Sequence, residues 1–181
     1  MQEQLYNRRK FLGRSLQFIA SATLLTPALS MAGNLDIRDL SFYHTHTGQT
    51  LDIAYKISGH YDPTALQQIN HHLQDFRTRE TYPIDPNLLD ILYSVKQQAG
   101  GGVYEVISGY RSPKTNGMLR KNSSGVAKRS LHMEGRAIDI RLTGLKTKEL
   151  RDIARSLQEG GVGYYPKSDF VHLDTGRVRY W

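Results

Sequence analysis

Two histidines and an aspartate give this sequence its clearest chemical signal. They lie in two segments, which read Ser130-x-His132-x-x-Gly135-x-Ala137-x-Asp139 and Phe170-Val171-His172-Leu173-Asp174. Two histidines with one carboxylate form a common ligand set for a catalytic zinc ion, in which the fourth position stays open to water or substrate. We therefore expect His132, Asp139 and His172 to bind zinc.

The residues around these ligands predict how they are positioned. Apolar residues alternate with Asp139 over 137–142, which predicts a strand with Asp139 on the face opposite Ile138 and Ile140. Gly135 would allow a tight turn between the loop that carries His132 and this strand. A second alternating run, 169–173, carries His172. The three ligands can converge if the two strands are neighbours.

The two segments resemble the zinc site of the D-alanyl-D-alanine metallopeptidases, a group that shares its core with lysostaphin-type peptidases and the hedgehog signalling domain. The resemblance is greater to bacterial murein endopeptidases of the endopeptidase K kind, and it covers most of the chain after residue 32. Two more segments support it, Ser108-Gly109-Tyr110-Arg111-Ser112 and Gly160-Gly161-Val162-Gly163-Tyr164-Tyr165-Pro166.

The resemblance also implies roles for Arg111 and Asp169. Arg111 would face the active site, where a guanidinium can bind a substrate carboxylate with two parallel bonds or support a developing oxyanion. Asp169, three residues before His172, matches the place of an acidic general base in several relatives. Residues three apart on a strand face opposite ways, so this role requires a bend or bulge near Phe170.

Two other carboxylates remain open as the general base. Glu134 and Asp174 are both close in sequence to a predicted ligand. Either one could instead orient a ligand histidine by a hydrogen bond to the ring nitrogen that does not bind the metal.

The remaining pattern predicts an α+β fold, with a small antiparallel sheet and helices packed at one face. Residues 38–57 alternate as a hairpin, Asp62-Pro63 and Asp85-Pro86 are expected to open helices, and Thr147 is expected to cap a third helix. Residues 113–130 predict a short helix and a mobile loop. Short strands are expected at 103–108, 162–165, 169–173 and 177–181.

Two other histidine pairs are interpreted as polar surface. His44 and His46 could bind metal from one strand face, but no third ligand stands close in sequence. His71 and His72 diverge by about 100° on a helix, so they cannot easily share an ion.

Composition and charge narrow the class of protein. The chain has 181 residues, 39% hydrophobic and 23% charged, which fits one soluble domain, expected to be a monomer. It has no cysteine, so disulfides and thiolate metal sites are excluded. The net charge is +7, of which residues 1–32 contribute +3, and the mildly basic remainder favours an anionic polymer such as cell wall. The cations are dispersed and form no recognised nucleic-acid motif, so nucleic acid is not an expected partner.

Residues 1–32 are expected to be an export signal, and residues 33–181 the zinc peptidase domain. Arg8 and Arg9 precede an apolar stretch at 16–29, and Ser30-Met31-Ala32 offers small residues for cleavage. The pair resembles a twin-arginine signal, with an ordinary secretory signal or an uncleaved anchor as the alternative. Location in the periplasm, without a stable membrane span after cleavage, is therefore predicted.

The predicted zinc ligands indicate a hydrolase, and the resemblance implies a peptidase that cuts peptide bonds in peptidoglycan. The resemblance favours an endopeptidase acting on cross-links, in particular those between two diaminopimelate residues. A carboxypeptidase that trims stem peptides would use the same chemistry. A zinc-containing wall-binding module without catalysis is the third hypothesis.

Overall fold

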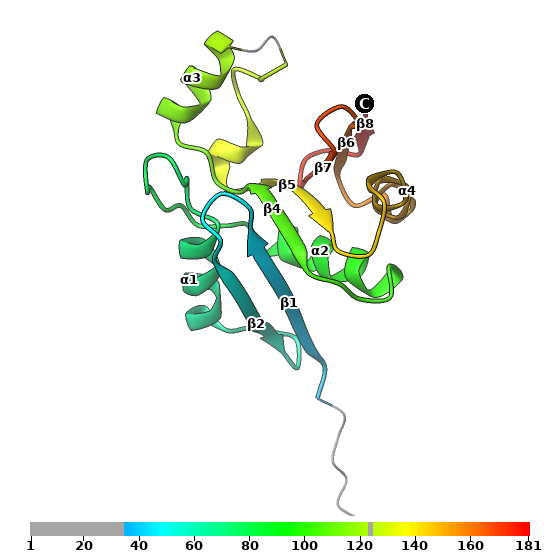
Figure 1. The fold of residues 1–181 in the computed structure, drawn as a ribbon. Helices are drawn as coiled ribbons and strands as arrows, with labels where there is room; N and C mark the ends of the chain where they lie inside the picture. The colour runs from blue at the N-terminus through cyan, green and yellow to red at the C-terminus, as the bar shows by residue number, and fades with distance from the viewer. Residues whose placement is uncertain (1–34, 123–124) are drawn as a thin grey trace, which may run out of the picture. The chain divides into compact units, whose positions relative to one another are not determined.

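The computed structural model describes residues 35–122 and 125–181, and these residues form an α+β fold, as predicted (Figure 1). The predicted export signal lies outside the described residues. The helices are α1 (Pro63–His72), α2 (Pro86–Gln98), α3 (Pro113–Asn122), the short 3-10 helix η1 (Leu131–Glu134) and α4 (Thr147–Leu157). The strands are β1 (Ile37–His44), β2 (Thr50–Ile57), β3 (His60–Tyr61), β4 (Tyr104–Ser108), β5 (Ala137–Leu142), β6 (Gly161–Tyr165), β7 (Phe170–Asp174) and β8 (Arg179–Tyr180).

The strands form one mixed sheet in the order β3-β2-β1-β4-β5-β7-β6-β8. Most neighbours are antiparallel, including the predicted hairpin of β1 and β2, but β1 pairs with β4 in parallel, and so does β6 with β8. The sequence predicts an antiparallel sheet, and these two parallel pairings make the observed sheet mixed. Helices α1 and α2 lie between β2 and β4 in the chain, and such a long crossover allows β4 to enter the sheet parallel to β1.

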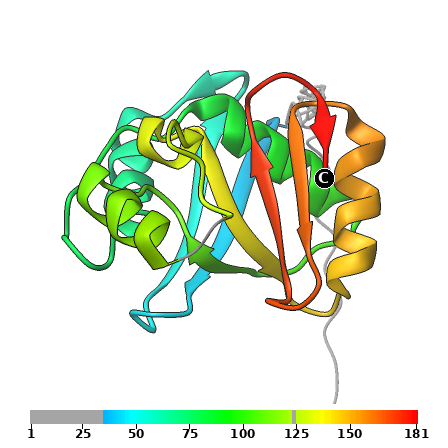
Figure 2. The ribbon, with the colours of Figure 1, turned by 90° about the horizontal axis from the view of Figure 1, so that it is seen from above.

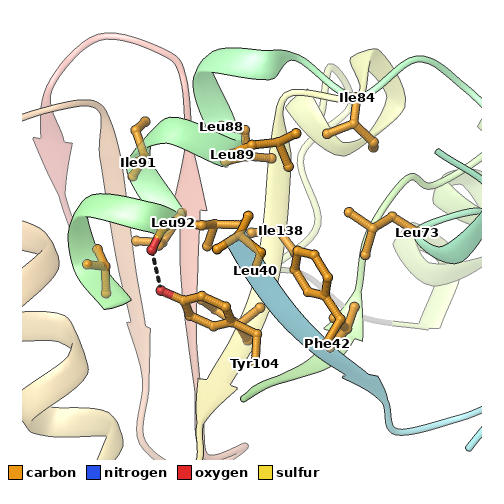
Figure 3. Packing of buried hydrophobic residues seen from close by; sticks show 14 of the residues in the cluster. Leu40, Phe42, Leu73, Ile84, Leu88, Leu89, Ile91, Leu92, Tyr104 and Ile138 are labelled. Atoms are coloured by element: carbon orange, nitrogen blue, oxygen red, sulfur yellow. Dashed lines mark hydrogen bonds between the residues drawn. The ribbon is translucent and has the colours of Figure 1, made fainter. Parts of the chain in front are cut away.

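The core lies between α2 and the central strands. Figure 3 shows Leu88, Leu89 and Leu92 of α2 pointing toward Leu40 of β1 and Ile138 of β5. These side chains are almost completely buried. The hydroxyl of Tyr104 donates to the carbonyl oxygen of Leu92 at 2.7 Å, which satisfies the polar atom of a buried ring. Helix α4 packs along β6 and extends the same layer (Figure 2).

Two of the three predicted helix starts are confirmed. The carboxylates of Asp62 and Asp85 accept hydrogen bonds from backbone N–H groups of the first turns of α1 and α2. Helix α4, in contrast, begins at Thr147 itself, with Lys146 as the N-cap residue. The backbone N–H of Lys146 donates to the Glu149 carboxylate at 3.3 Å, and this bond takes the place of the predicted threonine cap.

The interpretation of the two histidine pairs as polar surface is wrong for one member of each. His44 and His72 are buried, with 1% and 6% of their surface exposed. The His44 ring lies 5.6 Å from the ring of Phe76, and the His72 ring lies 5.8 Å from that of Phe42. The reason is strand alternation: His44 shares its face of β1 with two core residues, Leu40 and Phe42.

Among residues 35–122 and 125–181, no helix is both long and apolar enough to cross a membrane.

Candidate metal centre

Pairing of β5 with β7 brings two of the predicted ligands together. Asp139 on β5 lies directly opposite His172 on β7, and antiparallel partners in register point to the same face. Val171 and Leu173 point to the core face, as Ile138 and Ile140 do. The alternation that builds the core therefore places Asp139 and His172 on the other face.

His132 reaches the same place from η1. Gly135 ends η1 with a φ of 64°, a left-handed conformation that returns the chain toward β5. A Cβ atom at Gly135 would collide with the carbonyl oxygen of Pro83. The turn therefore needs glycine for its backbone angle and for its close packing.

The atoms of the three side chains have the spacing of a metal site. His132 Nε2 lies 3.2 Å from Asp139 Oδ1 and 3.2 Å from His172 Nδ1, and the last two atoms are 2.9 Å apart. Ligand atoms about 2.0 Å from a tetrahedral zinc ion are separated by about 3.3 Å. Within the described part of the chain, this is the one group of three or more such ligands. The spacing and chemistry of the three side chains fit a zinc ion.

The other polar atom of each of these side chains is held in place. His132 Nδ1 donates to the carbonyl oxygen of Gly109 at 2.8 Å, which leaves Nε2 free for a metal. His172 Nε2 donates to Asp174 Oδ2 at 2.9 Å, and Arg111 Nη2 donates to Asp139 Oδ2 at 3.3 Å. Partners of this kind fix the orientation of metal ligands.

Charges around the cluster favour a cation. Burial alone would lower the pKa of His172, but its hydrogen bonds to Asp139 and Asp174 outweigh burial and raise the pKa to about 9. Burial alone would raise the pKa of Asp139, but the charges and hydrogen bonds of the two histidines hold it well below its usual range. Burial lowers the pKa of His132. The centre thus has an ionised carboxylate and a preference for positive charge, which a metal ion can satisfy.

The cluster lines a cavity of about 490 Å³ that also contains Arg111. Arg111 is 8% exposed, and its Nε has no hydrogen-bond partner within the described residues. The structure therefore brings Arg111 to the site, as the resemblance implies, and ties one end of its guanidinium to a ligand side chain. The lining also includes Arg129, Tyr165, Phe170, Asp174, Arg179 and Trp181.

Asp169 lies elsewhere. Its carboxylate accepts a hydrogen bond from the Thr147 hydroxyl at 2.8 Å and pairs with Arg141 at 3.3 Å, and it lines a different pocket. The bend expected near Phe170 does occur: Asp169, the residue before it, has a φ of 50°. It turns the carboxylate away from His172, so the position of Asp169 gives no support to its assignment as the base.

The two alternative carboxylates also have partners. Glu134 is exposed and pairs with Arg136 at 3.2 Å. Asp174 is fully buried and binds both His172 and Arg179. Asp174 therefore has the geometry of the second alternative, a partner that orients a ligand histidine.

Sequence reasoning missed the contribution of the last strand. Arg179 binds Asp174, and the Trp181 ring lies 5.3 Å from the His172 ring. The residues Arg179 and Trp181 alternate with Tyr180, so the pattern of the strand could have placed both on one face.

The His-Asp-His cluster is buried beside a cavity, on the face of the sheet opposite the core. Sites of this kind are found in metal-dependent hydrolases. Residues 32–181 match the model of the family described as peptidoglycan L,D-endopeptidase MepK. The chain belongs to this family, and so to a family of peptidoglycan hydrolases.

Full-length relatives agree with this assignment. The chain is 38% identical to the probable peptidoglycan L,D-endopeptidase MepK of Haemophilus influenzae, over 97% of this chain and 95% of the relative. It is 39% identical to the peptidoglycan L,D-endopeptidase MepK of Escherichia coli strain K12 and to that of Shigella flexneri, over 97% of both chains in each case.

Proposed function

We propose that this protein is a zinc-dependent peptidoglycan endopeptidase that hydrolyses peptide cross-links, with links between two diaminopimelate residues (3-3 links) as its substrate. The observation that carries the proposal is the convergence of His132 Nε2, Asp139 Oδ1 and His172 Nδ1 at distances of 2.9 to 3.2 Å beside a cavity. Family membership supports the choice of peptidoglycan, because the relatives are named for it.

His132, Asp139 and His172 would hold the zinc ion. Bound there, zinc supplies Lewis acidity and lowers the pKa of a water molecule toward neutrality. Asp174 and Gly109 keep the two imidazoles in the tautomers that leave one ring nitrogen of each for the metal.

Arg111 would act on the substrate from the same cavity. Its guanidinium is held next to Asp139 and retains an unpartnered Nε. A cation in this buried place can support negative charge that develops on the scissile carbonyl oxygen, or bind a nearby stem-peptide carboxylate.

The general base stays a prediction. Asp169 could take a proton at the cavity only after leaving Thr147 and Arg141. Its neighbours Ser168 and Phe170 line the cavity, but Asp169 itself lines a different pocket, so this geometry does not favour Asp169 as the base.

The test is digestion of purified cross-linked muropeptide dimers, read by chromatography and mass spectrometry. The 3-3 dimers and the 4-3 dimers, whose link joins D-alanine to diaminopimelate, are supplied separately. The expected result is conversion of 3-3 dimers to monomers, lost on chelation and restored by zinc. His132→Ala, Asp139→Ala and His172→Ala should each lose the metal and the activity. Release of free D-alanine from intact dimers would instead indicate a carboxypeptidase, and tight binding without cleavage a wall-binding module.

We further propose that the protein acts in the periplasm as a monomer after export through its twin-arginine motif. Replacement of Arg8 and Arg9 with lysine should leave precursor in the cytoplasm. Unchanged export of the double variant would favour the general secretory route.

A further inference from the structure

One wall of the cavity is aromatic and has no part in holding the metal. Phe170 lies two residues before His172 on β7, so both side chains point to the same face. The Phe170 ring stacks on that of Tyr165 from β6, with centroids 4.6 Å apart. Trp181 continues the surface, because its Nε1 donates to the Tyr165 hydroxyl at 2.8 Å. Three segments of the chain thus build one aromatic wall.

Trp181 is fixed in this wall by several contacts. Its backbone N–H and carbonyl bond with Val162 and Tyr164 of β6 at 3.3 and 3.0 Å. The Arg179 guanidinium lies 5.0 Å from its ring, and a Cβ atom at Gly163 would come within 2.6 Å of that ring. Trp181 is nevertheless 46% exposed. A large apolar ring that is held firmly and remains half exposed to solvent offers a contact surface for a ligand.

The same cavity is also lined by an exposed cation. Arg129 lines it and forms no ion pair or hydrogen bond with any residue that the structure describes. A ligand that satisfies both features carries an aliphatic segment for the aromatic wall and a carboxylate for Arg129. A diaminopimelate residue has this chemistry, with three methylene groups and carboxylates on its ends.

Distance favours a peptide residue over a sugar at this wall. The Trp181 ring lies 5.3 Å from the His172 ring, so a group in contact with it lies next to the scissile amide. One residue spans about 3.5 Å, and the glycan is attached at the far end of a stem peptide, several residues away.

We propose that Trp181, with Tyr165 and Phe170, contacts the methylene chain of the diaminopimelate residue beside the scissile bond, and that Arg129 binds the carboxylate of that residue. This aromatic wall would determine the specificity for diaminopimelate. The inference rests on the proposed function.

Binding can be measured directly, because Trp181 is the single tryptophan of the sequence. The zinc-loaded protein is titrated with a diaminopimelate stem peptide, with the same peptide carrying its disaccharide, and with the disaccharide alone. Both peptides should shift the Trp181 emission with similar affinity, and the disaccharide should not. Arg129→Ala should weaken peptide binding about tenfold, as for a lost charge-assisted bond, with the emission of the free protein unchanged.

Kinetics with 3-3 dimers distinguish a direct contact of Trp181 with the substrate from a purely structural role of Trp181. Trp181→Ala should raise KM about tenfold with zinc content unchanged, and Trp181→Phe should keep most of the affinity because it retains a ring. Tyr180→Ala is the matched control, since the neighbouring Tyr180 is 43% exposed and its hydroxyl donates instead to the carbonyl oxygen of Arg155.

Two results would refute the proposal that the aromatic wall contacts diaminopimelate. One is unchanged emission with both peptides together with an unchanged KM in Trp181→Ala. The other is a shift produced only by ligands that carry sugar, which would assign the wall to the glycan. Failure of the wild type to cut any dimer would refute the proposed function. The titration would still show whether the aromatic wall binds the stem peptide.

Discussion

Replacement of Asp174 with asparagine should weaken zinc binding although Asp174 is not itself a ligand. The Asp174 carboxylate accepts five hydrogen bonds, from the backbone N–H groups of Gly161 and Gly176, from His172 Nε2, and two from Arg179. Its Oδ2 atom accepts both the bond from His172, at 2.9 Å, and one from Arg179, at 2.7 Å. An amide NH₂ at that position can accept neither.

The expected loss follows from what Oδ2 does for His172. The bond fixes the ring so that Nδ1 faces the metal, and the negative charge makes the imidazole a better electron donor. Loss of such a partner lowers metal affinity roughly 10- to 100-fold, which corresponds to about 1.4 to 2.8 kcal/mol. Stability should also fall by about 1 to 3 kcal/mol, because buried donors lose their acceptor.

The assay is competition for zinc with a chromophoric chelator at fixed pH. The matched control is Asp152→Asn, which changes an exposed carboxylate on α4 that pairs only with its neighbour Arg151 within the described residues. His172→Ala gives the loss of zinc affinity expected when a ligand itself is removed. Wild-type affinity in Asp174→Asn, with the protein folded, would refute the idea that Asp174 acts through His172.

Three further substitutions test other parts of the structure. Asp169→Asn should leave cross-link cleavage near the wild-type rate, because the carboxylate lies away from the cavity; a strong loss with zinc retained would instead restore Asp169 as the base. Gly135→Ala should destabilise by about 2 kcal/mol or more, from backbone strain plus collision with Pro83, whereas Gly144→Ala, with positive φ and no neighbour within 4 Å, should show the strain alone. His44→Phe should make stability less dependent on pH. Burial lowers the pKa of His44 to about 4, so the unfolded chain binds its proton first, and stability falls as pH drops from 6.5 toward 4. Urea unfolding at pH 7 and pH 4.5 should show about 2 to 3 kcal/mol less loss in the variant, and equal losses would contradict this account.

The faces on which Asp139 and His172 lie were predictable because strand alternation is a local pattern. Strand alternation separates Asp139 from Ile138 and Ile140, and separates His172 from Val171 and Leu173. Only the pairing of the two strands had to be assumed. The same alternation places Leu40 and Phe42 on one face with His44, so the burial of His44 could also have been predicted.

Features that depend on distant parts of the chain could not be predicted in the same way. The parallel pairing of β1 with β4 follows from how the intervening helices cross the sheet, which no local pattern specifies. The direction of the Asp169 carboxylate depends on a positive φ at a non-glycine residue and on partners at Thr147 and Arg141. A match in spacing to His172 contains none of this information.

The arrangement of hydrogen bonds explains how the fold can hold the cluster before a metal binds. Two imidazole nitrogens and a carboxylate oxygen within 3.2 Å of one another would lose solvation without gaining partners in an apolar setting. Here Gly109, Arg111 and Asp174 bind the far side of each group, and strand pairing fixes two of the three backbones. The cost of ordering the ligands is thus met by folding, so metal binding need not reorder them. Substitutions of the outer partners should therefore lower metal affinity as well as stability, whereas loss of core residues such as Ile138 should lower mainly stability.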